Sequence, residues 1–138
     1  MADVHPAADD PRQALSEERL MPTVAYGLYL LGAVTGGVTM VIGLIVAYAN
    51  LADAGPKAFS HYRFLIRTFW LAIAWFIIGG GMILFGAPLS LVLIGLPFLW
   101  LGWFICGAVG IWYLVRCCIG LIYLARGEAY PRPRTWLI

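Results

Sequence analysis

The ten residues from Leu31 to Met40 read LGAVTGGVTM, and they decide whether the first apolar block of the chain is one helix or two. This block runs from Met21 to Leu51. As one straight helix it would be roughly 46 Å long at about 1.5 Å per residue, and it would need an unusually large tilt to fit a bilayer. We therefore expect a break at residues 35–37 (TGG) and a helical hairpin over residues 21–34 and 38–50. Such a hairpin would dip into a membrane and return to the same side, packed on other helices that cover its turn.

Small side chains in this block support a second interpretation. They recur at helical spacing, at Gly32, Gly36, Thr39, Gly43 and Ala47. On a continuous helix they would form one ridge suited to close helix packing, with Gly32, Gly36 and Gly43 as its glycines. A ridge of this kind needs no break, so the sequence leaves a single span open.

The composition is typical of integral membrane proteins. Of the 138 residues, 62% are hydrophobic and 12% are charged, whereas soluble domains are about half apolar and about a quarter charged. The formal net charge of +2 is too small to indicate binding to nucleic acid. The first twenty residues lack the apolar core of a secretory signal. We expect a flexible tail over residues 1–20 and a helical membrane domain over residues 21–138.

Two further apolar blocks follow, Tyr62–Phe85 and Leu89–Ala125. A helix of about 20 residues crosses a bilayer, so each block can supply one transmembrane helix. We expect these helices over residues 60–85 and 98–125, with residues 86–97 as an uncharged turn or shallow re-entrant segment. The predicted fold class is all-α: a helical hairpin, or one broken helix, plus two long transmembrane helices.

The distribution of basic residues orients the chain. They follow the first apolar block and the last one, at Lys57, Arg63, Arg67, Arg126, Arg132 and Arg134. Short cytoplasmic loops of membrane proteins are rich in Lys and Arg. We therefore expect both segments, including a C-terminal tail over residues 126–138, on the cytoplasmic side of a bacterial inner membrane. The uncharged turn then lies on the opposite side.

Candidate contact residues gather in SHYRFLIRTFW, residues 60–70. If Ser60 caps the helix, the basic side chains of this stretch lie in its first two turns. One interpretation makes them interface anchors that hold their charged ends among anionic lipid headgroups. The candidate lipid or partner contacts are His61, Arg63, Arg67 and, on the last helix, Arg116.

A second interpretation turns Arg67 into the bundle toward Arg116. No acidic residue lies between Asp53 and Glu128, so neither arginine can find a carboxylate within the two long helices. The counter-ion must then come from a loop, a lipid or another chain. Ionisable residues inside a membrane are often functional.

Residue patterns that catalysis or cofactor binding would need are missing from the long helices. We find no Ser/His/Asp or Cys/His arrangement, no paired carboxylates and no phosphate-binding loop. Cys106, Cys117 and Cys118 lack metal-binding spacing and are expected to be buried small apolar side chains. His5 and His61 are the only histidines, which does not suit bis-histidine haem ligation. We expect no catalytic residue, no metal and no cofactor.

The order of these features resembles a known group of proteins. A glycine-rich first block precedes a helix that opens with SHYRF, and GEAYPRP (residues 127–133) follows the last helix. Over roughly residues 24–138 the chain resembles small bacterial membrane proteins of unknown function that are similar, at superfamily level, to the twenty-kilodalton component of the chloroplast inner-envelope import translocon. Positions that recur in that family map onto His61, Gly127, Tyr130 and Pro131. Relatives usually carry a glutamine where this chain has residues 64–66 (FLI).

The resemblance implies a four-element helical fold with both ends cytoplasmic, which favours the hairpin. The import role of the plastid relative is only a distant analogy. We expect a non-enzymatic accessory, structural or assembly subunit of a larger membrane complex, whose partners are other integral membrane subunits and anionic lipids. The alternative is a homo-oligomeric channel or protein-translocation component.

Overall fold

The computed structural model describes residues 11–136, which form four α-helices and one short 3₁₀ turn without any strand. The elements are α1 (Pro11–Val34), α2 (Val38–Leu51), α3 (Pro56–Leu89), η1 (Ser90–Val92) and α4 (Leu96–Ala125). Helix α1 begins at Pro11 rather than near Met21, so the second half of the predicted tail is helical. The first ten residues of that tail lie outside the described residues.

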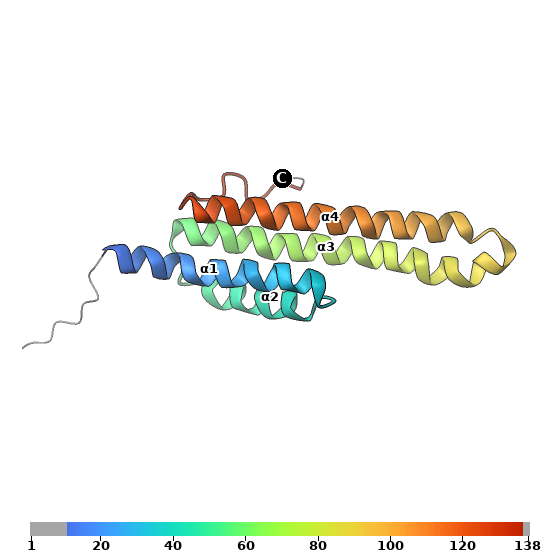
Figure 1. Ribbon diagram of the computed structural model, residues 1–138, viewed down its shortest axis with the longest axis horizontal. Coiled ribbons are helices and arrows are strands. Elements are labelled where there is room, and N and C mark those ends of the chain that lie inside the picture. Colours follow the sequence, from blue (N-terminus) through green and yellow to red (C-terminus); the bar gives the residue numbers. More distant parts are fainter. Residues whose placement is uncertain (1–10, 137–138) are drawn as a thin grey trace, which may run out of the picture.

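The helices form two antiparallel hairpins of unequal length. Helices α1 and α2 make the short one, whereas α3 and α4, of 34 and 30 residues, make the long one. The short hairpin lies along the part of the long hairpin that holds the start of α3 and the end of α4 (Figure 1). The turn between α3 and α4 projects well beyond it. The long hairpin is therefore covered over only part of its length.

The predicted break in the first apolar block is present. Residues 35–37 form the turn, where Gly36 and Gly37 have φ angles of 71° and 97°. This left-handed conformation strains residues with a Cβ but not glycine. A Cβ on Gly32 would lie 2.6 Å from the Cβ of Met40, so this predicted packing glycine lies between the two arms of the hairpin. Gly36 belongs to the turn instead, and a Cβ there would meet nothing within 4 Å.

Gly43 is the second packing position of the short hairpin. A Cβ on Gly43 would lie 2.7 Å from the ring of Tyr29, so the absence of a side chain lets α2 approach α1. Gly32 and Gly43 thus allow the two arms of the short hairpin to pack closely.

Helix α3 begins earlier than the sequence predicted. Gly55 is its N-cap and Pro56 occupies the first helical turn, a position where proline is common because no amide hydrogen is needed there. Ser60 is therefore not the cap. Its hydroxyl lies one turn inside the helix and donates a hydrogen bond to the carbonyl of Lys57 at 2.6 Å.

The turn between the long helices is shorter than the predicted segment 86–97. Helix α3 continues through Pro88 to Leu89, and α4 begins at Leu96 after the 3₁₀ turn. Gly86 and Gly95 lie against each other there, and a Cβ on Gly95 would overlap the carbonyl of Gly86. Close approach of the backbones thus lets the chain reverse within a few residues.

Glycines also line the contact between α3 and α4. A Cβ on Gly79 would lie 2.7 Å from the Sγ of Cys106, and one on Gly102 would lie 2.8 Å from the carbonyl oxygen of Gly79. Gly79 therefore serves close helix packing in the interior of α3. By length and composition, Pro56–Val92 and Leu96–Ala125 are each long and apolar enough to cross a membrane.

Candidate functional site

Buried polar side chains gather where the chain folds back after α4. We call residues 127–136 the closing segment; it returns over the start of α3 and the end of α4 (Figure 1). Within the described residues, the buried polar or charged side chains are His61, Thr68 and Arg116. Two of them bond to the closing segment directly and the third through a neighbour. These residues and the closing segment form the candidate site.

A glycine reverses the chain at the end of α4. Gly127 has a φ of 72° and donates its N–H to the carbonyl of Leu124 at 3.0 Å. The next amide, that of Glu128, donates to the carbonyl of Tyr123 at 3.0 Å. This pair of bonds around a left-handed glycine is the Schellman ending of a helix. It directs the closing segment back along the bundle.

His61 connects α3 with α1 and with the closing segment. Its Nε2 lies 2.9 Å from the carbonyl oxygen of Glu128, and its Nδ1 lies 3.2 Å from the hydroxyl of Tyr26. A carbonyl oxygen can only accept, so Nε2 carries the proton, and Nδ1 of the neutral ring accepts from Tyr26. Only 1% of His61 is exposed. Both ring nitrogens are thus engaged within the protein.

Tyr130 fills the space beside His61. Its ring centre lies 3.9 Å from that of Phe64 and 5.5 Å from that of Tyr123. The backbone N–H of Tyr130 donates to the hydroxyl of Ser60 at 3.1 Å. Burial raises the pKa of the Tyr130 hydroxyl, which therefore stays protonated at neutral pH. Tyr130 holds the closing segment by packing and by its backbone.

Arg116 is fully enclosed, with 0% of its surface exposed. Its Nε donates to the hydroxyl of Thr68 at 2.7 Å, and its Nη2 donates to the carbonyl of Thr135 at 2.9 Å. The guanidinium carbon lies 4.2 Å from the ring centre of Phe64 and 5.1 Å from that of Trp112. Aromatic faces attract a cation, more strongly when it is desolvated. Arg116 therefore joins α4 to α3 and to the closing segment.

Two tyrosines connect the short hairpin with the long one. The hydroxyl of Tyr29 donates to the carbonyl of Leu65 at 3.1 Å, and the hydroxyl of Tyr113 donates to the carbonyl of Tyr29 at 2.9 Å. The two rings are stacked, with centres 6.2 Å apart and planes 12° apart. These contacts fix α1 against both long helices.

The predicted contact residues occupy different environments. Arg63 is exposed, while Arg67 is half-buried with its guanidinium carbon 5.6 Å from the ring centre of Trp136. His61 and Arg116 are enclosed by the chain itself and have no surface to offer to lipid or to a partner. The structure thus corrects the expectation of an interface anchor for these two.

The site is built to hold chain segments together. The pocket beside His61 has a volume of about 30 Å³, which is room for about two water molecules. Among residues 11–136 no three His, Cys, Asp or Glu side chains come together as a metal site. Cys117 is buried as expected and Cys106 is half-buried, but Cys118 is exposed, so the expectation of a buried side chain was wrong for Cys118. The geometry favours a structural role for the polar cluster.

Some residues of the site were not singled out from the sequence. Thr68 is the only Ser, Thr, Asn or Gln in α3 after Arg67, and an isolated hydroxyl in an apolar helix was a usable signal. Tyr26 and the carbonyl of Thr135 carried no such signal, because their partners are distant in sequence. Comparisons of the chain with family models, curated proteins and solved structures find no match. Function must therefore be argued from the geometry.

Proposed function

We propose that this chain is a multi-pass integral membrane protein in which α3 and α4 span the bilayer. None of residues 68–115 is charged, and Arg67 and Arg116 border this stretch. The part of α3 from Arg67 to Leu89 is roughly 33 Å long at about 1.5 Å per residue, which is close to the about 30 Å of a hydrocarbon core. The α1–α2 hairpin then enters from the side of the two arginines, taken as cytoplasmic, and returns to it.

We further propose that the protein is a non-enzymatic accessory or assembly subunit that packs against another membrane protein. This proposal rests on one observation: the short hairpin does not cover the part of the long hairpin that leads to the turn between α3 and α4. We call the parts of α3 and α4 beyond the short hairpin the distal surface. Its most exposed side chains are large and apolar, at Ile77, Leu84, Phe85, Trp100 and Phe104.

Glycines on the distal surface favour a protein partner over lipid alone. A Cβ on Gly80, Gly81 or Gly107 would meet nothing within 4 Å, in contrast to Gly79 and Gly102 between the helices. In membranes, small residues at a helix surface allow another helix to approach closely. We call the surface positions of Gly80, Gly81 and Gly107 the glycine notches. They are suited to close packing of a transmembrane helix from another subunit.

The alternative is a homo-oligomer that forms a channel or translocation component, as the resemblance to the plastid translocon component suggests. The distal surface would then pack against a second copy. The side chain of Arg116 is enclosed and cannot line a water-filled path, which makes the channel the less favoured function. The order of the sequence motifs supports the proposed relationship to this family, and the hydropathy of the long helices supports the proposed membrane location.

The test fills the glycine notches. The variants Gly81→Leu and Gly107→Leu are expressed from the chromosomal locus with a tag, extracted in mild detergent and compared with wild type by native size and mass spectrometry. We expect the wild type to travel with another membrane protein at stoichiometric levels, and both variants to lose most of that partner because a leucine blocks close helix approach.

The matched control is Gly27→Leu, which places the same side chain at an open helical glycine of α1. It should retain the partner. A wild-type protein that elutes only with copies of itself would favour the homo-oligomer, whereas a stable monomer at native expression would contradict both assignments.

A further inference from the structure

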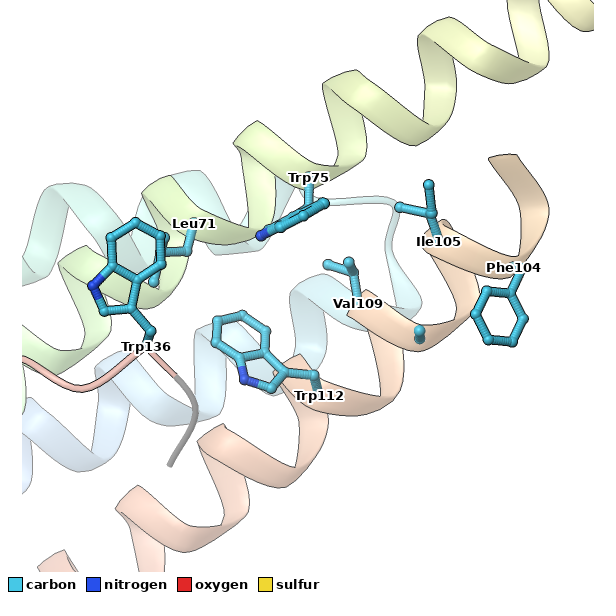
Figure 2. Close-up of a pocket in the computed structure, with 8 residues that line it drawn as sticks. Leu71, Trp75, Phe104, Ile105, Val109, Trp112 and Trp136 are labelled. Carbon is cyan, nitrogen blue, oxygen red and sulfur yellow. The ribbon is translucent and has the colours of Figure 1, made fainter. Parts of the chain in front are cut away.

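An aromatic groove runs between α3 and α4 on the side where the closing segment ends. It has a volume of about 390 Å³, within the range of small-molecule sites. Figure 2 shows Trp136 at one end of the groove and Phe104 at the other, with Trp75 of α3 and Trp112 of α4 between them. The walls are almost wholly apolar, so the groove suits a hydrocarbon chain or rings.

A cation marks one end of this groove. The guanidinium carbon of Arg67 lies 5.6 Å from the ring centre of Trp136, which lines the groove. Arg67, Leu71 and Trp75 follow each other at four-residue intervals, which places them on one face of α3. The groove therefore runs from a positive charge along about 12 Å of α3 into the apolar part of the bundle.

The described residues satisfy the guanidinium of Arg67 only in part. The Nε of Arg67 is buried and has no hydrogen-bond partner in the described part of the chain. The charge of Arg116 acts on that of Arg67 with the same sign, so the region attracts anions more strongly than one arginine would. No acidic residue lies between Asp53 and Glu128 to balance it from the long helices.

We infer that the groove binds one anionic phospholipid, with its phosphate at Arg67 and one acyl chain between Trp75 and Trp112. This inference rests on the proposed membrane location. Arg67 lies where the uncharged stretch begins, so a phosphate there would be at headgroup depth while the groove continues into the hydrocarbon layer. Charge and depth thus match one end of the groove to a headgroup and the other to a lipid tail.

Native mass spectrometry tests the inference. The purified protein is released from micelles that contain phosphatidylglycerol or phosphatidylcholine at matched concentrations. We expect the wild type to bind the first phosphatidylglycerol about tenfold more tightly than phosphatidylcholine, because phosphatidylglycerol has a net negative charge whereas the choline of phosphatidylcholine neutralises its phosphate. Arg67→Gln should abolish this preference.

Two control variants show whether an effect comes from the groove itself. One tests the loss of any surface charge, and the other tests the addition of any large side chain. Arg63→Gln removes an exposed arginine one turn earlier and should change the preference by less than about twofold, as expected for an exposed charge. Ala108→Trp fills the groove from α4 and should lower the affinity for both lipids. Ala74→Trp adds the same bulk at an exposed alanine of α3 outside the groove and should leave both affinities unchanged.

The outcomes distinguish this inference from the proposed function. Equal binding of both lipids by wild type, or a preference that survives Arg67→Gln, would overturn the lipid site while leaving the membrane protein intact. A dimer that Ala108→Trp abolishes and phosphatidylglycerol does not displace would place a second copy in the groove and overturn it too. Release of the protein from membranes by alkaline carbonate would overturn the membrane location, and the lipid site with it.

Discussion

The guanidinium group of Arg116 lies inside the bundle, where removing a charge from water costs several kcal/mol after relaxation. The hydroxyl of Thr68, the carbonyl of Thr135 and two aromatic faces offset this cost. The sequence predicted Arg116 as a site residue but not its direction. A helix that is apolar on every side has no polar face from which to infer which way one arginine points.

The first prediction at this scale concerns Thr68. Its hydroxyl donates to the carbonyl of Phe64 at 2.8 Å and accepts from Arg116. Thr68→Val keeps the shape but removes the hydroxyl that accepts from the buried Nε of Arg116. We expect a loss of about 2 kcal/mol in the free energy of unfolding. Reversible unfolding in mixed micelles measures it.

Thr23→Val is the matched control. The hydroxyl of Thr23 also donates to the carbonyl four residues earlier, that of Arg19, at 2.6 Å, but at an exposed position. Its replacement should change the free energy of unfolding by no more than about 0.5 kcal/mol. Similar losses in both variants would show that Arg116 does not depend on Thr68.

Among the elements, the short hairpin was the best predicted. Its turn could be located because residues 35–37 combine two glycines with a block too long for one span. The helix ends were less predictable, since Gly55 and Pro56 begin α3 before the apolar stretch does. A hydropathy pattern shows which residues can lie in lipid or in a protein core. Helix caps and tight turns depend on local backbone geometry, which this pattern does not show.

In the second prediction, the sign of the change in the free energy of unfolding distinguishes a hairpin from a continuous helix. Gly36 and Gly37 have positive φ angles, which cost an L-residue roughly 1–2 kcal/mol each. The double variant Gly36→Ala, Gly37→Ala should therefore lower the free energy of unfolding by about 2–4 kcal/mol. In a continuous helix the same change would raise it, because alanine is the better helix former by about 1 kcal/mol per residue.

Gly27→Ala provides the reference for helix propensity. Gly27 lies within α1, and a Cβ there would meet nothing within 4 Å. The substitution should be neutral or stabilising by up to about 1 kcal/mol. Stabilisation by the turn variant as well would contradict the hairpin.

At the scale of the whole molecule, the basic residues and the segments that cover the long hairpin lie at the same end. The short hairpin, the closing segment and the basic residues of the described chain surround one end of the long hairpin, and the other end is bare and uncharged. The sequence already shows that Lys and Arg cluster near this end, whereas the side of a membrane that this end faces stays a prediction. It could not predict the closing segment as a folded part, because its contacts with α3 span 67 to 70 residues.

The third prediction concerns topology. In a variant with alanine at all three native cysteine positions, single cysteines are introduced by Asp53→Cys, Leu91→Cys and Ala129→Cys, all at exposed positions. An impermeant maleimide applied to spheroplasts should label only Leu91→Cys. The other two should react only after the membrane is permeabilised, since their loops lie on the side of the basic residues. Labelling of Asp53→Cys in intact spheroplasts would contradict the proposed orientation.

The closing segment has a consequence for how the protein is made. The ribosome adds Glu128 long after His61, and Thr135 after Arg116, so each buried side chain exists before its partner in the closing segment does. At about 5–20 residues per second, the 67 residues between His61 and Glu128 take roughly 3–13 s to translate. During that interval His61, and later Arg116, lack only the hydrogen bonds that the closing segment provides in the finished fold. The last part of this sequence to be translated is therefore the part that completes the hydrogen bonding of two buried side chains.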